Sequence, residues 1–235
     1  MRFLNNLFAG SPLAARALPF VIFLVLTCCQ GSPGSELTYW VYALKTVVGV
    51  WLLWEMWPYV TEARYKLSWE AVAVGVGVAV VWVGVNCDWT TQNHLWIKLG
   101  FSQPPEKPDK MWNPFEQFTG DAMMAWGMVA VRILGSSLVV PPIEEAFYRS
   151  FLYRYISKEK FMDVPLDRLV PKSFVITALI FGFSHNEWLA GILCGLAYQW
   201  LVVRKGHLGD AMTAHGITNF LLGVWVVWKG AWIFW

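Results

Sequence analysis

Residues 120–149 read GDAMMAWGMVAVRILGSSLVVPPIEEAFYR. The first part, Gly120–Val140, is apolar over the ~20 residues that a helix needs to cross a bilayer. Pro141 and Pro142 interrupt this run, and a new helix is expected just after them, because proline is tolerated in the first turn of a helix. The following segment, Ile143–Ser157, is apolar with charges on it. The stretch therefore predicts a membrane span followed by an amphipathic helix.

The rest of the chain contains further apolar runs of helical length. Of the 235 residues, 57% are hydrophobic and 14% are charged, against roughly 25% charged in soluble proteins. A soluble domain this apolar would have too little polar surface to cover itself. Because hydrocarbon tolerates only closed hydrogen-bonding structures, and no short alternating strands occur, we predict an all-α polytopic membrane bundle of about seven or eight helices. The other candidate helices are Leu13–Cys29, Leu37–Val60, Trp69–Cys87, Ser173–Ser184, Trp188–Val203 and Leu208–Trp228.

A polar linker, Asp88–Phe118, separates two sets of helices and is predicted to be a long extramembrane loop. Its prolines are Pro104, Pro105, Pro108 and Pro114. Residues 1–118 carry no recognisable motif, whereas residues 119–235 hold all the candidate site residues. No soluble second domain fits between the apolar runs, so we expect one integrated domain over residues 1–235.

Basic residues concentrate in Ser157–Lys172, and Arg204-Lys205 and Arg64/Lys66 can lie on the same side. The positive-inside rule predicts that this side is cytoplasmic, in a multi-pass protein of the cell (inner) membrane. The net charge of +2 and the lack of a basic stripe argue against a nucleic-acid partner. The four cysteines show neither zinc spacing nor a disulfide framework.

Ionisable residues inside membrane segments are costly and are functional candidates by default. Residues four apart share one face of a helix, so Glu145 is predicted to pair with Arg149. Adjacent residues point about 100° apart, which leaves Glu144 facing elsewhere without that partner. A buried carboxylate with no partner suits a general base, whereas a structural ion pair that locks two helices is the plain alternative.

Two more polar sites occur in apolar runs. FGFSH at residues 181–185 places His185 at the end of one run, and HGITN at residues 215–219 places His215 and Asn219 on one helix face. Each alone would be read as a packing residue. At a rise of ~1.5 Å per residue, Glu144, His185 and His215 lie about 21, 20 and 15 Å from the basic loops. If those loops share a membrane face, the three residues have similar depths, and we predict a common site.

A carboxylate and an imidazole that converge on one water can remove its proton and generate a nucleophile for a peptide carbonyl. His215 and Asn219 could then donate hydrogen bonds to the developing oxyanion. Glu144, His185 and His215 could alternatively bind zinc or another divalent metal, which would acidify a bound water. Neither an HExxH helix nor a GxSxG elbow is present, so the residues leave both mechanisms open.

The motifs EExxxR at residues 144–149, FxxxH at 181–185 and HxxxN at 215–219 resemble those of type II CAAX prenyl proteases, in the CPBP intramembrane protease family. The resemblance covers about residues 141–219. It implies an all-helical membrane fold with a catalytic cavity within the bilayer and a peptide or protein substrate, lipidated or membrane-anchored forms included. Glu144 looks like the water-activating residue and His185 its partner. Glu145 with Arg149 would be a supporting pair, and His215 with Asn219 the oxyanion site.

Three other functions fit parts of the pattern. A non-catalytic scaffold or immunity protein would use the buried polar cluster only for packing. A haem or quinone protein would use His185 and His215 as ligands, and a transporter would move protons on Glu144 and Glu145. We favour the protease. Arg132, Lys45 and Glu55 also lie in candidate spans, where snorkelling or ion pairing is expected.

Overall fold

The computed structural model describes residues 3–31, 35–103 and 111–235. These residues form helices and no strand, which confirms the predicted all-α bundle. The helices are α1 (Asn5–Gly10), α2 (Pro12–Cys28), α3 (Glu36–Met56), α4 (Trp69–Gly84), α5 (Gln92–Lys98), α6 (Pro114–Gln117), α7 (Ala122–Leu134), α8 (Val140–Glu145), α9 (Tyr153–Ser157), α10 (Pro171–Phe183), α11 (Trp188–Lys205) and α12 (Gly209–Lys229).

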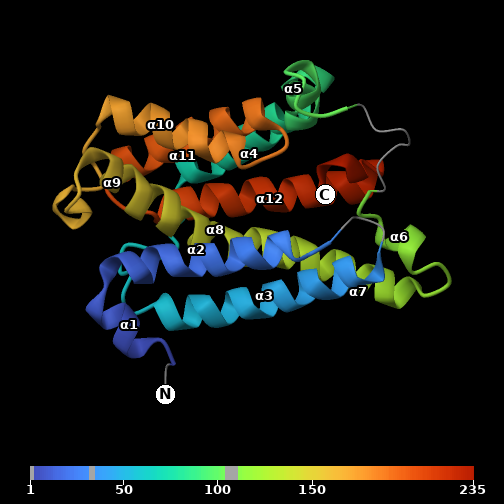
Figure 1. The fold of residues 1–235 in the computed structure, drawn as a ribbon, viewed down its shortest axis with the longest axis horizontal. Helices are drawn as coiled ribbons and strands as arrows, with labels where there is room; N and C mark the ends of the chain where they lie inside the picture. The colour runs from blue at the N-terminus through green and yellow to red at the C-terminus, as the bar shows by residue number, and fades with distance from the viewer. Residues whose placement is uncertain (1–2, 32–34, 104–110) are drawn as a thin grey trace.

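The long elements run along one axis of the molecule (Figure 1). Two of them, α12 and the helix built from α7, α8 and α9, pass through the middle. On one side α2 packs against α3, and on the other α10 packs against α11 while α4 packs against α12. The central position of α12 and its neighbour brings segments far apart in sequence into contact at one place.

The helix formed by α7–α9 is continuous over Ala122–Ser157, and we call it the long helix. The prediction that it ends at Pro141-Pro142 and restarts after them is wrong. Wider, π-type turns lie on either side of the prolines, at Gly135–Val139 and Ala146–Leu152. Proline has no N–H, so carbonyls one turn earlier lose their usual helical donor. A helix can still continue in a membrane if neighbouring side chains bond these carbonyls.

Two such side chains are present. The Asn219 amide of α12 donates to the Ser136 carbonyl at 2.8 Å. The Tyr65 hydroxyl, from the segment between α3 and α4, donates to the Leu138 carbonyl at 3.0 Å. The proline pair is therefore accommodated by tertiary contacts, and one of them fixes a candidate site residue.

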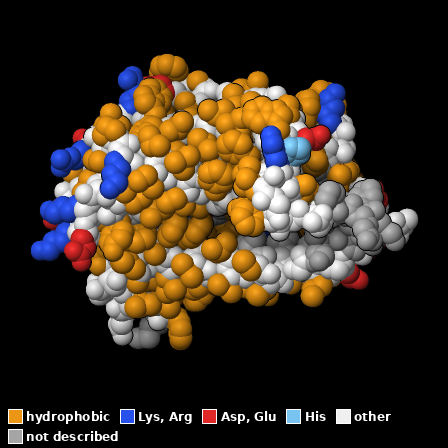
Figure 2. Space-filling view, turned by 45° about the horizontal axis from the view of Figure 1, so that its top comes forward, with side chains coloured by type: hydrophobic (Ala, Val, Ile, Leu, Met, Phe, Trp, Pro, Cys, Tyr) orange, Lys and Arg blue, Asp and Glu red, His pale blue; other side chains and the backbone are white. Residues whose placement is uncertain are grey.

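The outer surface is that of a membrane protein. Three helices among the described residues are long and apolar enough to cross a bilayer: α3, the long helix and α12. Shorter apolar helices are α2, α4 and α10. Large hydrophobic side chains such as Val47, Val80 and Phe220 are more than half exposed, and hydrophobic side chains cover most of the face between the two ends in Figure 2. Lipid, rather than water, satisfies such a surface.

The segments around Arg64/Lys66, Arg204-Lys205 and Ser157–Lys172 lie at one end of the bundle. This is the condition on which the common depth of Glu144, His185 and His215 was predicted. Lys205 Nζ lies 2.9 Å from the Glu70 carboxylate at the start of α4. The backbone N–H of Leu208 donates to the Glu62 carbonyl at 3.3 Å, and Arg154 Nη2 lies 3.5 Å from the Glu62 carboxylate. The lysines and arginines of this end are grouped at the left of Figure 2.

Glu62 ties this end together. Its carboxylate lies 2.7 Å from Arg16 Nη2 and accepts a hydrogen bond from the Ser150 hydroxyl. Burial on its own would raise the pKa of Glu62, but Arg16 and Ser150 outweigh it and hold the pKa below its usual value. The charged carboxylate thus links α2, the long helix and the loop before α4.

The predicted loop Asp88–Phe118 is partly helical. It contains a 3₁₀ turn at Asp88–Thr90, then α5, and Pro114 begins α6. Proline suits this last position because the first turn of a helix has no N–H partner to lose. Pro104, Pro105 and Pro108 lie outside the described residues.

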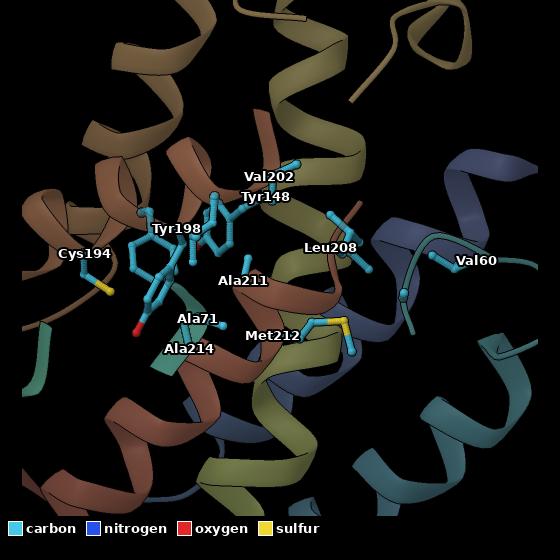
Figure 3. Close-up of a cluster of buried hydrophobic side chains, with 14 of the residues drawn as sticks. Val60, Ala71, Tyr148, Cys194, Tyr198, Val202, Leu208, Ala211, Met212 and Ala214 are labelled. Carbon is cyan, nitrogen blue, oxygen red and sulfur yellow. The ribbon is translucent and has the colours of Figure 1, made fainter. Parts of the chain in front are cut away.

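The main apolar core lies where α4, the long helix, α11 and α12 meet (Figure 3). Tyr198 of α11 and Ala214 and Met212 of α12 are fully buried within it. Gly75 lets α4 approach α12 closely, since a Cβ at this position would lie 2.7 Å from the Ala214 carbonyl oxygen. The Gly75 carbonyl in turn accepts a hydrogen bond from Thr218 at 2.9 Å. Small residues at such crossings are typical of membrane helices.

Gly75→Ala is expected to destabilise the protein by about 1–3 kcal/mol, because the added methyl group meets backbone that cannot move aside. The measurement is the thermal unfolding midpoint in detergent. Gly77→Ala is the matched control on the same helix, since nothing lies within 4 Å of its Cβ. Equal midpoints for the two variants would show that α4 and α12 are not held this closely.

Candidate active site

The predicted site residues share one cavity. Glu144 of the long helix, His185 after α10, and His215 and Asn219 of α12 all line a cavity of about 220 Å³. It lies inside the bundle, with further walls from α3, α4 and the C-terminal residues. The sequence prediction that separate helices bring these four side chains together therefore agrees with the structure, while their catalytic roles stay predictions.

The Glu144 carboxylate lines the cavity and forms no ion pair with another described residue. Oε2 is buried and has no hydrogen-bond partner among the described residues. A buried carboxylate oxygen without a donor is costly unless a ligand or water fills its place. Glu144 therefore presents an unused proton acceptor to the cavity.

The neighbouring Glu145 differs in having charge partners, although its Oε2 likewise accepts no hydrogen bond from a described residue. Arg149 Nε lies 3.2 Å from Glu145 Oε2, with both side chains fully buried, as the four-residue spacing predicted. His215 Nδ1 lies 3.1 Å from the other oxygen, Oε1. Sequence reasoning missed this second contact, because the two residues are 70 positions apart. Glu145 thus holds the long helix to α12 and orients the His215 ring.

Arg149 gains a second contact from the aromatic core. Its guanidinium carbon lies 4.6 Å from the centre of the Phe181 ring, on the helix that leads to His185. A cation over an aromatic face is stabilised electrostatically, most strongly where water is excluded. Arg149 therefore couples the Glu145 pair to α10.

His185 is oriented by backbone. Its Nδ1 lies 2.7 Å from the Phe181 carbonyl oxygen, which can only accept, so Nδ1 carries the proton. The neutral ring then has its free lone pair on Nε2. Trp82 of α4 contacts the imidazole edge to face, with ring centres 5.5 Å apart. His185 is thus held in the tautomer that can accept a proton from a water.

His215 and Asn219 are held on the opposite wall. His215 is stacked on Tyr198, with ring centres 5.1 Å apart, and uses Nδ1 for Glu145. Its Nε2 can donate a hydrogen bond when the ring carries both protons. Asn219 donates one side-chain N–H to the Ser136 carbonyl, and the second N–H of its amide can donate another hydrogen bond.

A metal is less well matched by these side chains. Within the described parts of the chain, no group of three His, Cys, Asp or Glu side chains is arranged to hold a metal ion. Glu144, His185 and His215 share a cavity without forming such a group. The geometry as it stands does not fit a three-ligand zinc site.

Three charged residues in the spans, Glu55, Lys45 and Arg132, were expected to snorkel or to form ion pairs. The Glu55 carboxylate accepts the backbone N–H groups of Phe3 and Leu4 at 2.9 and 3.0 Å. Lys45 Nζ bonds the Thr27 hydroxyl at 3.2 Å. Arg132 lines the cavity that Glu144 and His185 share. None of the three forms an ion pair with another described residue, so the expected ion pairing is not found.

Comparison with known proteins agrees with the family resemblance of the three sequence motifs. Residues 126–221 match the family model described as type II CAAX prenyl endopeptidase Rce1-like. The matched segment contains the four predicted site residues in the cavity and the Glu145–Arg149 pair. The match confirms the resemblance to CPBP intramembrane proteases and supports a membrane protease. No curated protein and no solved structure matches the chain.

Arg149→Met is expected to lower stability by about 3–5 kcal/mol, because it leaves the buried Glu145 carboxylate short of its counter-charge. The thermal unfolding midpoint in detergent measures the loss. Lys158→Met is the control, since its pair with Asp163 is more than half exposed, so its removal is expected to change little. Two variants equally close to wild type would contradict a structural role for the buried pair.

Proposed function

We propose that this protein is an intramembrane endopeptidase that hydrolyses a peptide bond with a water activated by Glu144 and His185. The observation that carries the proposal is the unsatisfied Glu144 carboxylate on the wall of a cavity shared with two histidines and an asparagine. A purely structural cluster would be expected to give this carboxylate a counter-charge, as Arg149 does for Glu145.

The first step is proton removal from a water held between Glu144 and His185. Either the carboxylate or Nε2 of His185 takes the proton, and the hydroxide adds to the carbonyl carbon of the substrate. The tetrahedral carbon then carries an oxyanion. The acquired proton passes to the amide nitrogen, the C–N bond breaks as the oxyanion collapses to a carbonyl, and a carboxylic acid and an amine are released. Proton transfer from the acid to the amine then gives a carboxylate and an ammonium group.

His215 and Asn219 stabilise the oxyanion in this proposal. His215 donates from Nε2 and Asn219 from its second N–H. Both are fixed before the substrate arrives, His215 by Glu145 and Asn219 by Ser136. Donors that need no rearrangement during reaction are the most effective, since their ordering cost is met on folding.

The setting limits the substrate. The cavity lies within an apolar bundle, so a peptide or protein substrate that is itself membrane-anchored, including a lipidated one, reaches it most readily. A prenyl group is implied by nothing outside the three motifs. We place the protein in the cell (inner) membrane with its basic end in the cytoplasm, because positive charge accumulates on that side.

Glu144→Gln removes the charge with little change of shape and is expected to slow peptide cleavage by roughly 100- to 10,000-fold. Purified protein in detergent and a peptide library, analysed by mass spectrometry, provide the measurement. Glu159→Gln, an exposed carboxylate on the loop after α9, controls for the substitution. Unchanged cleavage by Glu144→Gln would eliminate the mechanism. Unchanged biological function with no cleavage by wild type would favour the scaffold.

A chelator separates the two routes to an activated water. Because no three-ligand group is present among the described side chains, EDTA or phenanthroline is expected to leave cleavage unchanged. Purified protein should then contain less than one equivalent of metal by mass spectrometry. Activity abolished by chelator and restored by zinc would replace the Glu144–His185 mechanism with a metal-bound water.

A further inference from the structure

Arg132 is a cavity residue that the proposed mechanism does not use. It lies on the long helix with Ser136, Val140 and Glu144, at intervals of four residues, and all four line the cavity. Residues at this spacing share one helix face. The same face therefore presents the general base at one place and a guanidinium further along.

Aromatic rings enclose this guanidinium. Its central carbon lies 4.5 Å from the centre of the Trp112 ring, 4.9 Å from Tyr42 and 5.3 Å from Trp235. Stacking on ring faces fixes the plane of the group but leaves its N–H donors, which lie at the edge, without acceptors. The three rings, which form an aromatic cage, therefore orient the Arg132 guanidinium but accept no hydrogen bond from its N–H groups.

The charge of Arg132 has no acidic partner in the described part of the chain. Among the described residues, no carboxylate lies within ion-pair distance of Arg132, and its side chain forms no hydrogen bond there. Glu187 also lines the cavity, but its carboxylate accepts from the Asn186 amide at 3.1 Å. The contrast with Arg149 is direct, since that arginine has its own glutamate on the next turn.

An uncompensated guanidinium in a low-dielectric cavity favours binding of an anion. Its planar fork of N–H groups matches a carboxylate, which it can hold with two parallel hydrogen bonds. Since no described residue supplies this anion, we assign it to the molecule that enters the cavity, which by the proposed function is the substrate.

We propose that Arg132 is a specificity-determining residue that binds a carboxylate of the substrate while the scissile bond lies at Glu144. This inference rests on the proposed proteolysis. The two residues are 12 positions apart, or roughly 18 Å along the helix. An extended peptide covers ~3.3–3.6 Å per residue, so the anion lies at most about five residues from the cleaved bond. The reach of the two side chains shortens that spacing.

Two sources can supply the carboxylate: the C-terminus of the substrate or an acidic side chain near the cleaved bond. Each peptide of the library is therefore made as a free acid and as a C-terminal amide, with a downstream Glu or a Gln. The free acid or the Glu form is expected to be cleaved with a kcat/KM about 10- to 100-fold above its neutral counterpart. Preference for the free acid identifies the terminus, and preference for Glu identifies the side chain.

Arg132→Met is expected to abolish this preference by raising KM for the anionic peptide, with a smaller effect on kcat. Arg132→Lys, which keeps the charge but loses the fork, is expected to retain part of it. Lys229→Met is the control, because Lys229 stacks on Trp228 at 4.0 Å and does not line the cavity. If Arg132→Met does not fold, the role of Arg132 is tested by the wild-type preference for anionic over neutral peptides and by the change of that preference in Arg132→Lys.

Binding separates this inference from proteolysis itself. The same peptide pairs are titrated against Glu144→Gln protein, followed by tryptophan fluorescence. If wild type cleaves nothing but Glu144→Gln binds the anionic peptides more tightly, the proposed hydrolysis fails and the anion site stands. Equal binding and equal cleavage of anionic and neutral peptides, or a preference that survives Arg132→Met, would overturn the role of Arg132.

Discussion

The buried Glu145 carboxylate is the contact on which the site depends. One oxygen faces Arg149 on its own helix and the other faces His215 on α12, so a single side chain joins the two central helices. Buried charge is tolerable only where its partners are fixed, and here each partner is also held by an aromatic ring, Phe181 or Tyr198. Glu145 is engaged by these two partners, whereas Glu144, on the adjacent face of the helix, lines the cavity.

The proline pair contributes a second constraint. By removing two N–H groups from the middle of the long helix, it makes backbone carbonyls available to side chains from other elements. Asn219 uses one of them and Tyr65 another. A feature that would break a helix in water therefore serves, in an apolar bundle, to orient a site residue and to join the long helix to its neighbours.

Local spacing was enough to predict part of this arrangement. The Glu145–Arg149 pair follows from four-residue periodicity, and the shared cavity follows from three polar motifs at similar depth. The continuity of the helix through Pro141 and Pro142 could not be predicted, because the compensating donors come from distant segments. The same is true of the contact between Glu145 and His215.

Arg132 illustrates a different limit. A single cation in an apolar run resembles many that snorkel, and its aromatic cage is assembled from three parts of the chain: Tyr42, Trp112 and Trp235. The four-residue spacing of Arg132, Ser136, Val140 and Glu144 can be read from the sequence. Its meaning depends on which helix face is turned inward, and only the packed structure fixes that.

The helices of the bundle differ greatly in length, and the surrounding bilayer must adapt to this. The long helix has 36 residues, or roughly 54 Å, whereas α10 has 13, or roughly 20 Å. A hydrocarbon layer of ~30 Å is too thin for the first and too thick for the second. We therefore expect the two leaflets to approach each other beside α10, and the long helix to tilt or to project into the headgroups. His185 follows that short helix, so the unequal lengths predict a thinner bilayer next to the cavity wall.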